Sequence, residues 1–74
     1  MKYSFESSKS SNIARAEYES DTRRMVVTFK GKSGETRYSY EHVPPADWDA
    51  FHWSKSKGEH FAKEIRGKHK GVKL

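Results

Sequence analysis

The chain has 74 residues, of which 32% are hydrophobic and 14% aromatic, and a formal net charge of +5. That length allows one small domain, and the absence of Cys excludes disulfides and thiolate metal sites. No apolar run approaches the ~20 residues needed to cross a bilayer, and the first residues lack the apolar stretch of a secretory signal. The composition therefore predicts a cytoplasmic protein without membrane association.

The first predicted elements are strands. Residues 1–9 are rich in Ser, so we expect a flexible N-terminal segment, although Tyr3 and Phe5 alternate with polar residues in a way that also allows a short edge strand. Three strands follow, predicted over Ile13–Glu19, Arg24–Lys30 and Glu35–Glu41. Because short turn-like connections join antiparallel neighbours, these segments predict a three-stranded meander.

Alternation along the strands assigns their faces. Ala14, Ala16 and Tyr18 share one parity of the first strand. Met25, Val27 and Phe29 share a face in the second strand, and Tyr38 and Tyr40 do so in the third. We interpret both tyrosines as core residues that face the helices, since a small two-layer domain needs their area for burial. The alternative is an aromatic platform on which bases stack.

Two helices are predicted after the strands. Pro44-Pro45 ends the sheet and begins the first helix, on which Trp48 and Phe51 share a face. Ser56 and Glu59 form a capping-box pattern that opens a second helix through about Arg66. We predict an α+β fold in two layers, β-β-β-α-α, with both helices on one face. The domain spans 10–67, and 68–74 form a basic, frayed C-terminal tail.

These spaced residues resemble one known family. The resemblance rests on Ser11-Asn12-Ile13, Tyr18, Met25-x-Val27-x-Phe29, Tyr38-x-Tyr40-x-x-Val43-Pro44, Trp48, Ser56-x-Gly58-x-x-Phe61 and Ile65-Arg66. The chain is similar to the KTSC domain family, named after the C-terminal extension of some lysyl-tRNA synthetases and also found as small stand-alone proteins of bacteria and phages. The resemblance implies RNA binding. The chain departs from the family pattern at Asp47, His52 and Ser54 of the first helix and at Ala62.

The positive charge points independently to an anionic partner. From Lys55 onward seven bases face two acids, a net charge of +5, whereas residues 1–54 hold eight bases and eight acids. A neutral body with a basic end indicates a docking surface for a polyanion, most commonly nucleic acid. A solvated basic surface without a partner is the alternative. The candidate nucleic-acid-binding residues are Trp53, Lys55, Lys57, Lys63, Arg66, Lys68 and Lys70.

Trp53 and the adjacent loop each allow two interpretations. Trp53 lies about 140° around the helix from Trp48, so it either packs under a neighbouring segment or is exposed for a partner. The stretch Ser54–Gly58 either contacts phosphate or is an ordinary capped turn between helices. If about five phosphates are neutralised, the logarithm of the binding constant falls with the logarithm of the salt concentration at a slope near −3.5.

A second candidate face is the open side of the sheet. The parity opposite to the core residues presents Arg15, Arg24, Lys30 and Arg37. Such a face is a possible platform for phosphates or bases. A solvated outer face is equally compatible with an antiparallel sheet that carries helices on one side.

No catalytic, metal or cofactor site is predicted. His60 and Glu64 lie four apart on a helix, but two ligands without Cys make a poor metal site. No Ser lies in a nucleophile-elbow pattern.

The sequence thus predicts a non-enzymatic nucleic-acid-binding module, with RNA favoured over DNA through the family resemblance. The competing hypothesis is a protein-interaction module, such as a small phage or mobile-element factor that docks through an acidic surface of a host nucleic-acid enzyme. The sequence does not indicate an oligomeric state.

Overall fold

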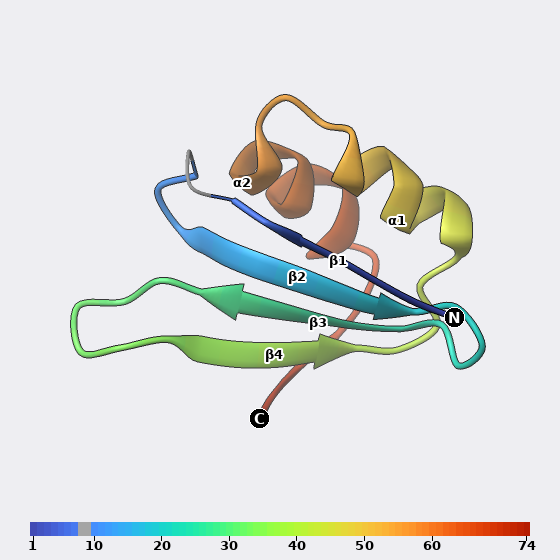
Figure 1. Ribbon diagram of the computed structural model, residues 1–74, viewed down its shortest axis with the longest axis horizontal. Helices are drawn as coiled ribbons and strands as arrows, with labels where there is room; N and C mark the ends of the chain where they lie inside the picture. Colours follow the sequence, from blue (N-terminus) through green and yellow to red (C-terminus); the bar gives the residue numbers. More distant parts are fainter. Residues whose placement is uncertain (8–9) are drawn as a thin grey trace.

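A computed structural model describes residues 1–7 and 10–74 and shows one five-stranded antiparallel sheet with helices on one face (Figure 1). The strands lie in the order β1-β2-β3-β4-β5. In chain order the elements are β1 (Lys2–Glu6), β2 (Ile13–Glu19), β3 (Arg24–Phe29), β4 (Thr36–Tyr40), α1 (Pro45–His52), α2 (Lys57–His60), the π-helical turn η1 (Phe61–Ile65) and β5 (Gly71–Lys73). The fold is therefore α+β.

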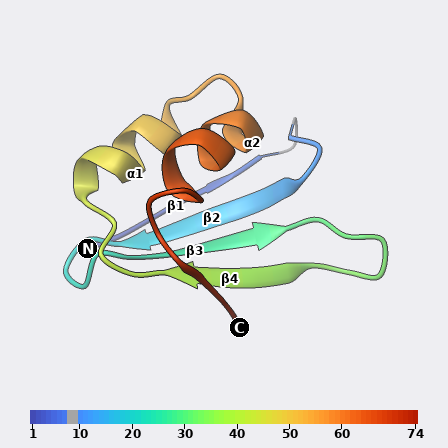
Figure 2. The same ribbon diagram turned by 180° about the vertical axis from the view of Figure 1, so that it is seen from behind.

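The prediction of a three-stranded meander is wrong, because the sheet has a further strand at each edge. β1 pairs with β2 and lies within the segment 1–9, of which residues 8–9 are outside the described residues. β5 pairs with β4 and lies within 68–74, which we expected to be frayed. Figure 2 shows the C-terminal segment crossing from the helices to the edge of β4. Both additions follow from tertiary contact, since Phe5 packs on the rings of α1 and Gly71 lies on Tyr40.

The three central strands agree with the prediction within one residue at each end, but the pattern of β2 differs inside the strand. The register between β2 and β3 shifts between Ile13 and Arg15. This bulge turns Ile13 into the core beside Ala16 and Tyr18 and leaves Ala14 only half-buried. The predicted alternation placed Ala14 on the core face with Ala16 and Tyr18, and at the start of β2 this assignment is wrong.

The core lies between the helices and the inner face of the sheet. Its buried members come from both layers: Ile13, Ala16, Tyr18, Met25, Val27, Tyr40, Val43, Trp48, Phe51, Phe61 and Ile65. Val43 joins the layers, because its N–H donates to the Arg23 carbonyl at 2.8 Å and its carbonyl accepts the Tyr18 hydroxyl at 2.6 Å. These two bonds fix the point where the chain leaves the sheet and enters α1.

The helices begin where the sequence predicts. Pro44 is the N-cap of α1, and Trp48 and Phe51 form its buried face. The Ser56 hydroxyl accepts the Glu59 N–H at 3.4 Å and caps α2. The second helix then widens, since the Arg66 N–H bonds to the Phe61 carbonyl, five residues earlier. Across the described part of the chain, no helix is long and apolar enough to span a membrane.

Candidate functional site

Three surface hollows are candidates for a binding site. The first, about 700 Å³, lies between the connection from β1 to β2 and the N-terminal part of α2, and we call it the serine groove. The second, about 620 Å³, lies between the inner face of β4 and the segment that follows η1, and we call it the tyrosine groove. The third, about 340 Å³, lies on the open face of the sheet. Six of the ten predicted cations line these hollows, two in each.

The floor of the tyrosine groove is a cluster of aromatic rings. Phe29, Tyr38, Tyr40 and Phe61 line it together with Thr36 and Gly71. Phe29 packs edge-to-face with Tyr38 at 5.8 Å between ring centroids and with Phe61 at 5.3 Å. Tyr40 is buried and packs on Phe61, whereas Tyr38 is half-buried and reaches the groove. Interlocking edges hold these rings rigidly, so the floor is preformed.

Cations form the rim of the tyrosine groove. Arg66, His69 and Lys70 line it, and none of the described lining residues is acidic. Burial raises the pKa of Tyr40, and the Arg66 charge, which lines the same groove, acts in the opposite sense. His69 Nε2 lies 3.4 Å from Asp47 Oδ2 and ties this rim to α1. Within residues 1–7 and 10–74, Arg66 and Lys70 form no ion pair.

β5 adds a further cation beside the tyrosine groove. Lys73 pairs directly with Tyr38 across the ladder, and paired residues of an antiparallel sheet point to the same face. The Lys73 side chain is exposed. Tyr38 therefore shares the groove with Arg66 and Lys70 and pairs with Lys73 on the neighbouring strand.

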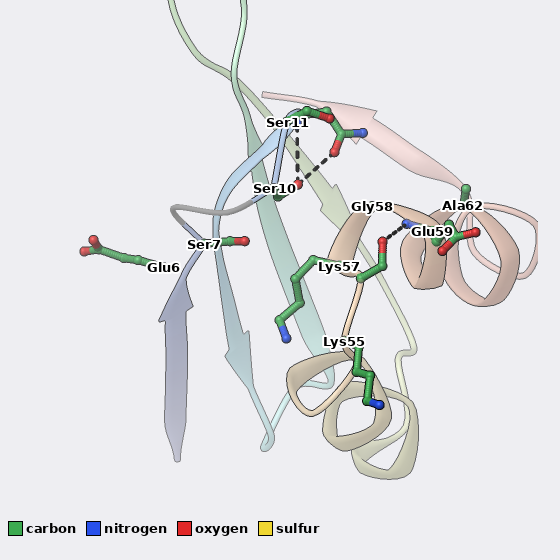
Figure 3. A pocket seen from close by; sticks show the side chains of 11 residues that line it. Glu6, Ser7, Ser10, Ser11, Lys55, Lys57, Gly58, Glu59 and Ala62 are labelled. Atoms are coloured by element: carbon green, nitrogen blue, oxygen red, sulfur yellow. Dashed lines mark hydrogen bonds between the residues drawn. The ribbon is translucent and has the colours of Figure 1, made fainter.

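The serine groove holds the loop that we considered as a phosphate contact (Figure 3). Figure 3 shows Ser7 and Ser10 beside it, with the Lys57 side chain extending toward the strands, and Ser56 also lines this groove. Lys57 Nζ donates to the Ser54 carbonyl at 2.6 Å and lies 5.3 Å from the centroid of the Phe5 ring. Both contacts tie the Lys57 ammonium to the protein itself.

Among the described residues that line the serine groove, bases and acids are equal in number. Lys55 and Lys57 line it, but so do Glu6 and Glu59. The Ser56 hydroxyl is already engaged as the cap of α2. These contacts support the interpretation of Ser54–Gly58 as a capped turn, and this groove offers an anion less than the tyrosine groove does.

The remaining predicted residues lie elsewhere on the surface. Lys63 lies 4.0 Å from Glu59 and Lys68 lies 3.9 Å from Glu64, both as exposed ion pairs along the helix. Trp53 is 75% exposed at the C-terminal end of α1, so it is not packed under a neighbouring segment. It does not line any of the three hollows.

The open face of the sheet carries the second candidate set, whose members have separate partners. Arg15 lies 3.8 Å from Glu17, and Arg24 lies 3.6 Å from Glu41. Lys30 Nζ donates to the Ser10 carbonyl at 2.6 Å, near the connection between β1 and β2. Arg37 lines the hollow on this face together with two acids, Glu17 and Glu19. The face is therefore of mixed charge, which fits a solvated surface.

Among the residues that the structure describes, no group of three or more His, Cys, Asp or Glu side chains is placed to hold an ion.

Comparison with known proteins identifies the family. The family model of the KTSC domain matches residues 9–69. The chain belongs to the KTSC domain family. A crystal structure of the KTSC domain protein YPO2434 from Yersinia pestis is similar, with a TM-score of 0.84 and 30% sequence identity over 100% of this chain and 99% of that one. No curated protein matches the chain.

The residues that indicate the KTSC family line both grooves. Tyr38, Tyr40, Phe61 and Arg66 belong to the tyrosine groove. Ser11 and Asn12, with Ser56 and Gly58, belong to the serine groove. Asn12 packs against Gly58 so closely that a Cβ at Gly58 would lie 2.8 Å from Asn12 Oδ1. The close approach brings the connection between β1 and β2 against the start of α2, and the contact is made by the end of an exposed side chain.

Two residues at or beside the tyrosine groove are absent from the predicted site residues. Tyr38 was interpreted as core, with a stacking platform as the alternative, and it is half-buried against the core. Lys73, which pairs with Tyr38, was placed in a frayed tail. Tyr38 is the middle residue of β4, and alternation assigns the face of its ring but not how much of the ring the helices cover. The three residues of β5 have too short an alternation to predict a strand.

Proposed function

We propose that this KTSC domain is a non-enzymatic module that binds single-stranded nucleic acid, with RNA preferred, in the tyrosine groove. One observation supports the proposal: the half-buried Tyr38 ring lines the same groove as Arg66 and Lys70, and among the described lining residues there is no acid. An aromatic ring on which a base stacks, flanked by cations for the adjacent phosphates, is the usual chemistry of single-strand binding. Preference for RNA rests on the family, whose name refers to lysyl-tRNA synthetases.

The size of the groove favours a single strand. The protein measures 33 × 26 × 23 Å, and the aromatic floor lies inside a hollow of about 620 Å³. Bases reach such a floor only when they are unstacked and splayed out, which loops and single strands permit and a continuous duplex does not. Phosphate contacts carry little sequence information, so we expect modest sequence specificity.

The test is the affinity of matched double variants for a labelled single-stranded RNA. Arg66→Gln with Lys70→Gln removes the two groove cations, and we expect affinity to fall about tenfold or more, since each lost phosphate contact weakens polyanion binding. Lys63→Gln with Lys68→Gln removes the same charge from exposed ion pairs outside the groove and is the control. We expect the control to retain most of the affinity.

A further variant and two competitors distinguish binding in the tyrosine groove from general electrostatic attraction. Tyr38→Leu keeps an apolar side chain but removes the stacking ring, so we expect weaker RNA binding at unchanged salt dependence. Duplex DNA and tRNA serve as competitors, and we expect the single strand to compete best. Equal losses in the two double variants, or no binding of any nucleic acid beside a stable acidic protein partner, would contradict the proposal.

A further inference from the structure

Trp53 is an exposed ring held in a fixed orientation. It lies 4.9 Å from His52 between ring centroids at an interplanar angle of 11°, and His52 in turn stacks on Phe5 at 5.4 Å and 15°. Phe5 packs against Trp48 and the rest of the core. Although 75% of Trp53 is exposed, the column anchors one face of its indole and leaves the other open. Trp is among the residue types enriched at interface hot spots, and a ring that is already held in place loses less conformational freedom on binding.

The surroundings of this indole are acidic on the helix side. At 100° per residue, Asp49 lies between His52 and Trp53 around α1 and one turn before Trp53. Asp49 is exposed, as are the small side chains of Ala46 and Ala50 on the same side of the helix. The other acid of α1, Asp47, faces away and contacts His69. The nearest predicted base, Lys55, lines the serine groove instead.

This combination selects a planar cation. A carboxylate beside the ring repels a phosphate group, and this repulsion distinguishes the surface from the tyrosine groove. A guanidinium satisfies both groups at once, because it stacks on an indole face and donates parallel hydrogen bonds to a carboxylate. A lysine ammonium lacks the planar fork and the stacking face. The alanines allow the backbone of a bound segment to approach the helix closely.

We infer that the exposed side of α1, with Trp53 and Asp49, is a docking site for an arginine-bearing segment of a partner protein. The guanidinium stacks on the open indole face and bonds to the Asp49 carboxylate. Ala46 and Ala50 accommodate the neighbouring residues of that segment. The site shares no residue with the tyrosine groove, so it stands or falls independently of nucleic-acid binding.

The test begins with selection of a displayed library of random short peptides on the intact protein, with counter-selection on Trp53→Ala. We expect enrichment of Arg over Lys in peptides that need Trp53. For an enriched peptide measured by fluorescence anisotropy, replacing its Arg by Lys should weaken binding about threefold to tenfold, because stacking and bidentate bonding are lost together. Asp49→Asn should weaken binding to a similar extent.

Matched controls make the result decisive. Glu35→Gln removes the same charge from an exposed site in the turn between β3 and β4, and it should leave peptide affinity unchanged. Arg66→Gln with Lys70→Gln should also leave it unchanged. Because Trp53 is exposed, circular dichroism should show that Trp53→Ala folds normally. Peptides without an Arg preference, an Asp49→Asn variant that binds as well as wild type, or single-stranded RNA that competes at Trp53 would overturn the inference.

Discussion

The Tyr18 hydroxyl makes the shortest side-chain bond that joins the two layers of the domain. It donates to the Val43 carbonyl at 2.6 Å, and the Val43 N–H donates to the Arg23 carbonyl. Tyr18→Phe leaves the buried carbonyl without this donor, so we expect the free energy of unfolding to fall by about 1–2 kcal/mol. Urea denaturation measures the change. Tyr3→Phe, which alters an exposed tyrosine, is the control and should cost much less.

The same hydroxyl predicts a loss of stability at alkaline pH. Burial raises the pKa of Tyr18 above its ordinary value of 10.0, because the folded environment disfavours the phenolate. A raised pKa in the folded state means that this stabilisation is complete below pH 10 and is lost as pH rises through the folded pKa. We expect unfolding midpoints measured above pH 10 to decline less steeply in Tyr18→Phe than in wild type. Parallel alkaline curves would contradict this account.

At the residue scale, the sequence predicted burial well where strict alternation held. Met25, Val27, Trp48 and Phe51 are buried as expected. It failed at Ile13, because a bulge depends on pairing with β3 and leaves no mark in the alternation itself. For Trp53 the helical period excluded the core face, but only the stack on His52 explains how the ring is held.

Two glycines test how the elements pack, and they should respond in opposite ways. A Cβ at Gly71 would lie 2.7 Å from Cε1 of the buried Tyr40 ring, which cannot move away from Phe61. We expect Gly71→Ala to displace β5 and lower the free energy of unfolding by about 1–2 kcal/mol. Amide hydrogen exchange at Val72 and Leu74 should accelerate, since their backbone lies beside β4.

Gly58→Ala is the comparison. The added Cβ meets the exposed side chain of Asn12 at 2.8 Å, and a flexible amide can move aside. Alanine favours the helix by up to about 1 kcal/mol over glycine, which offsets the lost contact. We expect the stability of Gly58→Ala to lie within about 0.5 kcal/mol of wild type. A larger loss than in Gly71→Ala would show that the approach of Asn12 to Gly58 matters more than the docking of β5.

At the element scale, the sequence predicted strands and helices that have a clear period and clear ends. β2, β3 and β4 alternate between turn-forming residues, and Pro44 marks the start of α1. The two edge strands could not be assigned from a local pattern, because each forms only by pairing with its neighbouring strand. β5 has three residues and forms only by pairing with β4, more than thirty residues earlier in the chain. Local propensity contains no information on such a contact.

At the scale of the whole molecule, folding distributes a basic end that looks uniform in the sequence. Lys63 and Lys68 are engaged in ion pairs, and the Lys57 ammonium is bonded within its own loop. Arg66, Lys70 and Lys73 remain around the Tyr38 ring. Two of the seven bases in residues 55–74, Arg66 and Lys70, line the tyrosine groove. The sequence alone does not distinguish the cations at the groove from those that the fold engages in ion pairs or hydrogen bonds.

This division predicts a shallower salt dependence of RNA binding than the sequence alone suggested. Three groove cations that neutralise about three phosphates of a single strand give a slope of about −2 for the logarithm of the binding constant against that of salt concentration. The seven bases of the basic end acting together would give about −5. Anisotropy titrations of single-stranded RNA at several salt concentrations measure this slope. Arg66→Gln with Lys70→Gln should reduce its magnitude by about 1.4, and Lys63→Gln with Lys68→Gln should leave it nearly unchanged.

A steeper slope that the second pair of substitutions also reduces would mean that RNA is attracted to the basic end as a diffuse charge. In that case the aromatic floor of the tyrosine groove would not be the binding site.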